Sequence, residues 1–270
     1  MVVLKKDIKT ALAFFLAAAF FAGAAVVPIR ADGHPAGPQK RKKVADEKNP
    51  QYQYELGVIA LRYGFPDEAI RYGELAVSLD PGHFNGWNLL GSAYFNKGDF
   101  AKAAEAYEKA AAIKPGAADI HRSLGMAYAE LKETDKAEAA LKKAFEAGGD
   151  AESAYLLGKL YYGARRFDEA LAFALKAIQK DGKSAKAYNL KGVTLNQLER
   201  YAESAGSFEA GLLLAPNDLN LQVNLGIAYL NSGQTAKAKA TFEAVLPKIE
   251  QDVMRKQVEG YLQFIKDAGK

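Results

Sequence analysis

The segment Asp181-Gly182-Lys183-Ser184 has the Gly-Lys-Ser order that ends a phosphate-binding loop. Such a loop also needs a glycine five residues before Gly182 and a preceding strand, because its backbone amides must surround the phosphates. Ala177 occupies that position, and no strand is expected before it. The sequence therefore predicts an ordinary turn here and no nucleotide chemistry.

Histidines and acidic residues form no catalytic or metal-binding set. His34, His83 and His121 include no pair at the spacing of zinc ligands, and we expect His121 to pack in the core. The acidic pair Asp67-Glu68 stands where a helix is expected to begin, and the helix dipole favours negative charge there. Because the chain has no cysteine, it has no thiol nucleophile, disulfide or thiolate metal site. We predict a protein that is not an enzyme and that uses no cofactor or metal.

Six glycines recur along the chain at steps of 34, 34, 33, 34 and 34 residues. A period of this length indicates one supersecondary unit copied in tandem. Within each copy, positions 4, 7, 8 and 11 share one face of a first helix, and positions 20, 24 and 27 share one face of a second. We call these helices A and B. The glycines stand at position 8, where they let A and B approach closely: Gly57, Gly91, Gly125, Gly158, Gly192 and Gly226.

Residues that stop helices end the copies. Pro81, Pro115 and Pro216 do so because proline lacks the backbone amide. In the third and fourth copies Gly149 and Gly182 take that place, and glycine commonly caps a helix end. Since one helix pair cannot bury its own apolar face, we expect the copies to stack.

The second copy matches a known family pattern most completely. Its matching residues are Trp87, Leu90, Gly91, Tyr94, Ala103, Tyr107, Ala110 and Pro115. The chain therefore resembles the tetratricopeptide-repeat family over about residues 50–250. The resemblance implies an all-α, right-handed superhelical solenoid of six helix-turn-helix repeats, at 50–83, 84–117, 118–150, 151–184, 185–218 and 219–250. The segment 251–270 keeps helical spacing, so we expect a capping helix that solvates the open end.

The amino terminus is typical of a targeting segment. Residues 1–31 combine a lysine-bearing start with an uncharged run at 11–29, which favours a signal peptide. The alternative is an uncleaved membrane anchor formed by residues 11–29, since this run is nearly long enough to span a bilayer. Either interpretation predicts a periplasmic or secreted protein, held in the second case at the inner membrane. Residues 32–49 are expected to be a disordered linker, whose basic run at 40–43 keeps a cytoplasmic orientation open.

Charge argues against a nucleic-acid partner. The formal net charge is +4, but residues 1–31 hold four of the 36 basic and one of the 32 acidic residues. The remaining chain therefore carries 32 basic and 31 acidic residues and has no basic excess to bind phosphates.

The family resemblance implies a binding surface on the concave side of the array, at positions 2, 5, 9 and 12 of the A helices. Asparagine amides there suit a peptide backbone, and aromatic rings supply contact area. The candidate peptide-binding residues are Tyr54, Asn85, Asn88, Phe95, Arg122, Met126, Tyr155, Lys159, Tyr162, Asn189 and Asn196, together with the nearby Asn224. The two-carboxylate clamp of some family members is absent, because Tyr54 and Val58 stand at its first positions.

We therefore predict a non-catalytic scaffold of the cell envelope that binds a partner peptide and supports assembly or secretion. The alternative is an accessory subunit that binds glycan or cell-wall polymer, since aromatic rings also stack on sugars. The sequence leaves the partner and the oligomeric state open.

Overall fold

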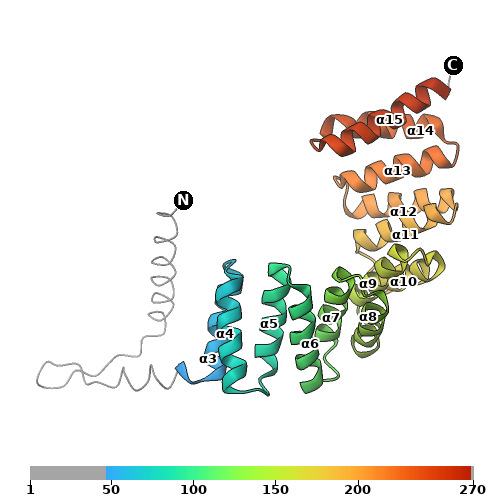
Figure 1. Ribbon diagram of the computed structural model, residues 1–270. Coiled ribbons are helices and arrows are strands. Elements are labelled where there is room, and N and C mark those ends of the chain that lie inside the picture. Colours follow the sequence, from blue (N-terminus) through green and yellow to red (C-terminus); the bar gives the residue numbers. More distant parts are fainter. Residues whose placement is uncertain (1–46, 269–270) are drawn as a thin grey trace, which may run out of the picture. The chain divides into compact units, whose positions relative to one another are not determined.

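The computed structural model describes residues 47–268, where the regular elements are helices (Figure 1). Both the expected signal peptide or anchor at 1–31 and most of the linker at 32–49 lie outside the described residues. Residues from Pro50 onward form one compact unit. The expected all-α solenoid is confirmed.

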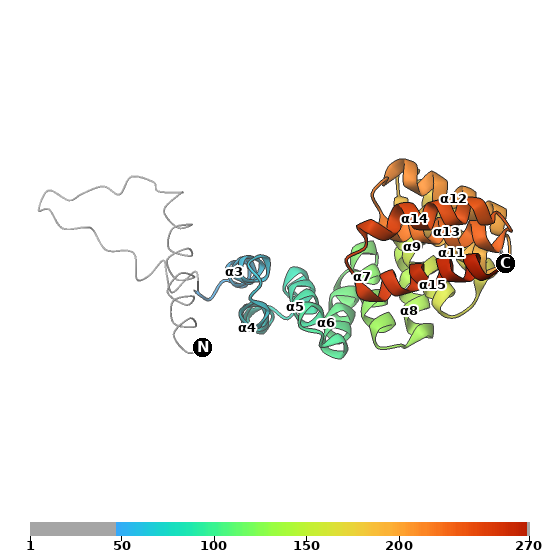
Figure 2. The same ribbon diagram turned by 90° about the horizontal axis from the view of Figure 1, so that it is seen from above.

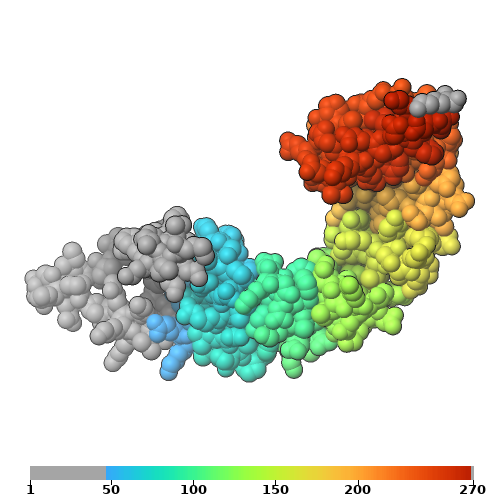
Figure 3. Space-filling view, turned by 45° about the horizontal axis from the view of Figure 1, so that its top comes forward, coloured from blue at the N-terminus to red at the C-terminus, as the bar shows by residue number. Residues whose placement is uncertain are grey.

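Six antiparallel helix pairs follow one another along the chain, each made of an A and a B helix. Figure 3 shows them succeeding one another along the surface in sequence order, from blue to red. The pairs are α3 (Pro50–Arg62) with α4 (Pro66–Leu79), α5 (Phe84–Lys97) with α6 (Phe100–Ile113), α7 (Ala118–Glu130) with α8 (Thr134–Gly148), α9 (Ala151–Gly163) with α10 (Phe167–Lys180), α11 (Ala185–Gln197) with α12 (Tyr201–Leu214), and α13 (Leu219–Asn231) with α14 (Thr235–Val245).

Glycine at position 8 allows the close approach of A and B that its spacing predicts. A Cβ on Gly91 would lie 2.5 Å from the ring of Tyr107, and one on Gly226 would lie 2.5 Å from the ring of Phe242. Those distances are shorter than any van der Waals contact. The rings at position 24 therefore occupy the space that the missing side chains leave.

The turn between A and B places position 15 in the left-handed backbone region. Glycine stands there in the first, second and sixth repeats, with φ between 76° and 81°. The third, fourth and fifth repeats instead have Lys132, Arg165 and Glu199, with φ of 62°, 60° and 59°. Side chains other than glycine strain the backbone in this region. Three of the six turns therefore carry a conformational cost.

Consecutive repeats are joined by tyrosines at position 11. Tyr94 donates its hydroxyl hydrogen to Glu74 of the preceding repeat at 3.1 Å, and Tyr161 donates to Glu138 at 2.9 Å. Tyr128 and Tyr229 bond to glutamates in the same way. Burial and the bond to Glu74 raise the pKa of Tyr94 to about 12. Position 11 thus adds a hydrogen bond between repeats to the ring packing expected from the sequence.

Position 4 supplies a second bond between repeats wherever the preceding repeat ends in proline. The indole N–H of Trp87 donates to the carbonyl oxygen of Pro81 at 2.9 Å. His121 Nε2 lies 2.7 Å from the carbonyl oxygen of Pro115, which can only accept, so Nε2 carries the hydrogen. Gln222 Nε2 reaches the carbonyl oxygen of Pro216 at 2.6 Å. The expected packing of His121 is confirmed, since 6% of its surface is exposed.

The chain ends with a short 3-10 helix, η1 (Leu246–Lys248), and α15 (Asp252–Ala268). Figures 1 and 2 show α15 lying along α14. Val258 and Ile265 are buried in this contact, and the ring of Tyr261 stacks on Phe242 with centroids 5.2 Å apart. Helix α15 thus covers the apolar side of the last repeat.

Candidate binding surface

The A helices form the inner layer of the stack. Consecutive A helices pack directly against one another from α3 to α13, whereas the B helices of consecutive repeats make at most marginal contact. In a curved stack the layer whose helices lie closest together is on the inside. We call the side chains at positions 2, 5, 9 and 12 of the A helices the inner face. Eleven of the twelve candidate residues stand at these positions, Asn224 lies next to them at position 6, and all twelve are half-buried or exposed.

Two candidate residues meet at a cavity of about 380 Å³ between α7 and α9, which we call the α7–α9 cavity. Met126 and Lys159, at position 9 of neighbouring repeats, both line it. Leu141, Leu156 and Leu160 add apolar wall. Its remaining lining residues are Ala129, Glu130, Lys132, Thr134, Gly163 and Ala164.

This cavity lies where the third repeat lacks an aromatic pair. In the second repeat Phe95 at position 12 packs edge-on against Phe100 at position 17, with ring centroids 5.2 Å apart. The fourth repeat pairs Tyr162 with Phe167 at 5.7 Å. The third repeat has Ala129 and Thr134 at these positions, and both line the cavity. Two small residues therefore leave the space that rings fill on either side.

The rim of the α7–α9 cavity carries positive charge. Among residues 47–268, neither Lys132 nor Lys159 forms an ion pair, and both are exposed. Arg165, the residue after the lining Ala164, is likewise unpaired within that range. Glu130 supplies the one opposing charge among the lining residues. The rim is therefore suited to an anionic group.

Arg122, nearby on α7, has its charge neutralised within the protein. Its Nη1 lies 3.1 Å from Oδ2 of Asp150, whose other oxygen accepts the backbone N–H of Ser153 at the start of α9. Burial alone would raise the pKa of Asp150, but the bonds from Ser153 and the charge of Arg122 hold it below its usual range. Arg122 therefore supports the junction between α8 and α9.

Asparagines at the inner face of α11 bond to asparagines next to the inner face of α13. Asn224 Nδ2 donates to Oδ1 of Asn189 at 3.0 Å. Two helical turns further along, Asn231 Nδ2 donates to Oδ1 of Asn196 at 3.3 Å. Each pair uses one donor and one acceptor of its side-chain amides, so fewer hydrogen-bonding groups remain for a partner's backbone.

The remaining candidates are distributed over three A helices. The ring of Tyr54 lies 5.8 Å from that of His83. Tyr155 has the ammonium of Lys186 over its ring at 4.7 Å, and Lys186 also pairs with Glu152. Asn85 is exposed on α5, and Asn88 on the same helix is half-buried. Met126 and Lys159 are the two candidates that line the α7–α9 cavity.

Several lining residues were missed because they lie outside the four inner-face positions or are small. Leu156 and Leu160 stand at positions 6 and 10 of their repeat, and Lys132 stands in the turn between helices A and B. The usable signal was the pair Ala129 and Thr134, which replaces rings at positions 12 and 17.

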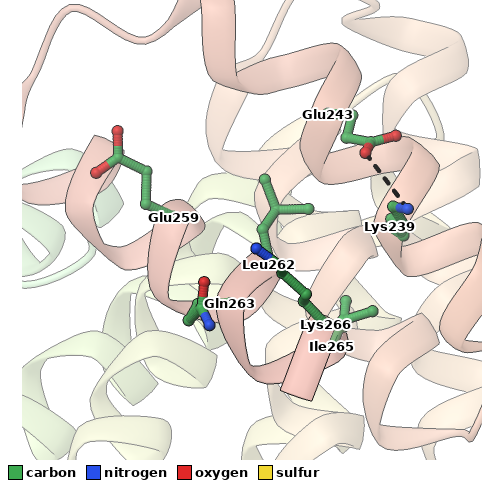
Figure 4. Close-up of a pocket in the computed structure, with 7 residues that line it drawn as sticks. All are labelled: Lys239, Glu243, Glu259, Leu262, Gln263, Ile265 and Lys266. Atoms are coloured by element: carbon green, nitrogen blue, oxygen red, sulfur yellow. Dashed lines mark ion pairs between the residues drawn. The ribbon is translucent and has the colours of Figure 1, made fainter. Parts of the chain in front are cut away.

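Two other hollows have different surroundings. One of about 550 Å³ lies between α14 and α15, where Figure 4 shows Leu262, Gln263 and Lys266 of α15 and the ion pair of Lys239 with Glu243 on α14. Another of about 580 Å³ lies across α6, α7 and α8, on the side of α7 that carries His121. Neither contains any of the twelve candidate residues.

Within residues 47–268, no group of three or more histidine and acidic side chains is placed to hold a metal ion. None of the helices in that range is long and apolar enough to cross a membrane.

Proteins of known structure share the fold. They include a tetratricopeptide repeat protein from Parabacteroides merdae, with a TM-score of 0.68 and 20% identity over 80% of this chain and 86% of that one. A chain of the Cut9–Hcn1 hetero-tetramer of the APC/C gives a TM-score of 0.63 and 20% identity over 81% of this chain and 43% of that one. The present chain therefore spans less than half the length of that chain. YrrB, described as a tetratricopeptide repeat protein with an unusual peptide-binding site, gives 0.58 and 18% over 68% and 96%. At these identities the likeness shows the fold alone.

Models of one repeat family match most of the array. No curated protein matches the sequence. A model described as TPR repeat matches residues 91–132, and models described as tetratricopeptide repeat match 155–219 and both 118–147 and 219–246. The chain is therefore a tetratricopeptide-repeat protein, with repeats matched in residues 91–147 and 155–246.

Proposed function

We propose that the protein is a non-catalytic scaffold that binds an extended segment of a partner protein along its inner face, with one side chain anchored in the α7–α9 cavity. The cavity is the observation that carries this proposal. Its apolar walls and about 380 Å³ of space fit a bulky side chain, and interface energy is concentrated where such an anchor enters a pocket.

The family supports a binding role of this kind. Tetratricopeptide repeats commonly serve protein interaction, and YrrB is described as having a peptide-binding site. The Cut9–Hcn1 structure is described as a hetero-tetramer. These properties belong to YrrB and to Cut9–Hcn1, and by analogy they favour a protein or peptide partner for the present chain.

The sequence of residues 1–31 supports a location in the cell envelope, where the scaffold would serve assembly or secretion. The same segment supplies a membrane tether if it remains uncleaved. Mass analysis of the mature amino terminus tests this part, and a chain that starts at Met1 in the cytoplasm would contradict it.

A binding selection tests the main proposal. Peptides from a random display library are selected on the full chain, then fitted with a photoreactive group and cross-linked to it. We expect cross-links at residues that line the α7–α9 cavity, such as Met126 and Leu156. Failure to select any peptide, or cross-links confined to other helices, would overturn the proposal. Selective binding of polysaccharide instead would favour the glycan alternative.

A further inference from the structure

We infer that the α7–α9 cavity selects a segment with one bulky apolar residue flanked by carboxylates. This inference rests on the proposed function and specifies the chemistry of its partner. It follows from the contrast between an apolar floor and a cationic rim at one place on the inner face.

The floor of the cavity favours a flexible apolar side chain. Met126 is 37% exposed there, and its unbranched thioether adapts to differently shaped partners. Leu156 and Leu160 are half-buried, and Leu141 closes the wall at 2% exposure. A leucine or phenylalanine entering this space would remove apolar surface from water on both molecules.

Within the described residues, no acidic side chain forms an ion pair with the two rim lysines. Other cations near the inner face are neutralised, since Arg122 pairs with Asp150 and Lys186 with Glu152. Lys132 and Lys159 line the cavity and form no ion pair in the described part of the chain. Among the lining residues the two lysines outnumber the single glutamate, Glu130, so the lining carries a net positive charge. Arg165, next to Ala164, and Asp135, next to Thr134, add one charge of each sign.

The two rim lysines come from different segments of the chain. Lys159 belongs to α9, whereas Lys132 lies in the turn between α7 and α8, so the two lysines reach the same cavity from different segments. An anchor in the cavity with an acidic residue on each side can therefore face both lysines. A segment with basic flanks would meet like charge instead.

Two synthetic peptides test this inference on the full chain. One has a leucine between two pairs of glutamates in a glycine-serine background, and its match has lysines in place of the glutamates. We expect the acidic peptide to bind about fivefold or more tighter at low salt, with the difference shrinking as salt is added. Lys159→Glu is expected to remove or invert the preference.

Lys109→Glu is the matched control, because it makes the same charge change at an exposed site on α6 outside the cavity. Equal binding of the two peptides, or equal effects of the two substitutions, would overturn the inference. If library peptides still cross-link at the cavity, the proposed function survives that result. If no peptide of any kind binds the full chain, the proposed function fails as well.

Discussion

The inner faces of α7–α9 and α11–α13 use equivalent repeat positions in different ways. On α11 and α13 asparagines bond to each other across the repeat junction, as Asn224 does to Asn189. On α7 and α9 the corresponding region has a cavity, and the charge of Lys159 on its rim has no partner among the described residues. The first arrangement uses polar groups to join repeats, and the second leaves them available to another molecule. One repeat family can therefore divide structural and binding roles along a single array.

Filling the cavity is expected to have the largest effect. Ala129→Phe introduces an aromatic residue at position 12, where the second repeat has Phe95. Its ring would occupy the space in the cavity that the anchor side chain is proposed to enter. We expect binding of selected peptides to weaken about tenfold or more, measured by calorimetric titration. Lys109→Phe, at an exposed site on α6 outside the inner face, is the control and should bind nearly as the parent does. Equal losses in both variants would mean that α7–α9 has no special role.

Alkaline pH is expected to distinguish α13 from α11. Burial and the bond to Glu209 raise the pKa of Tyr229 to about 12, whereas α11 has Leu195 at that position. A tyrosine of the unfolded chain ionises near pH 10. The stabilisation by Tyr229 is therefore complete below pH 10 and is lost as the pH rises towards 12.

Thermal unfolding between pH 9 and 12 measures this loss. We expect Tyr229→Phe to lose less stability over that interval than the parent, because it has one fewer tyrosine whose pKa is raised by folding. Leu195→Met should follow the parent's profile. An unchanged profile for Tyr229→Phe would contradict the assignment of the raised pKa.

The two left-handed turns at Lys132 and Glu199 compare the regions more finely. Replacing either residue by glycine should raise the free energy of unfolding by about 0.5–1 kcal/mol, because the strain at φ of 62° or 59° is relieved. Denaturant titration measures both gains. Of the two substitutions, only Lys132→Gly should also weaken binding of the acidic peptide, since Lys132 lines the cavity and Glu199 does not. A similar loss of binding in Glu199→Gly would argue against a local effect.

The smallest effect is expected at the asparagine pair. Asn224→Ala removes a half-exposed hydrogen bond and should lower the free energy of unfolding by about 0.5 kcal/mol. Urea titration measures this loss, and peptide binding at α7–α9 should stay at the parent's value. A marked loss of binding would move the site towards α13.

The helix pairs could be predicted from the sequence because they depend on contacts within one repeat. Glycine at position 8 and a ring at position 24 meet in the same hairpin, as Gly91 and Tyr107 do. The site was only partly predictable, because it depends on contacts between repeats. The inner-face positions gave Met126 and Lys159, but the cavity requires Ala129 and Thr134 to be small together. Sequence position likewise could not show that Asn189 meets Asn224, 35 residues away.

The hydrogen bond from position 4 to the preceding proline carbonyl has a consequence for repeat exchange. Indole, imidazole and carboxamide donors all make it, in Trp87, His121 and Gln222. What is shared is an N–H group that reaches the carbonyl, while the bulk of the side chain varies. A chimaera assembled from such modules should therefore be cut inside a hairpin, so that each donor travels with the proline it serves.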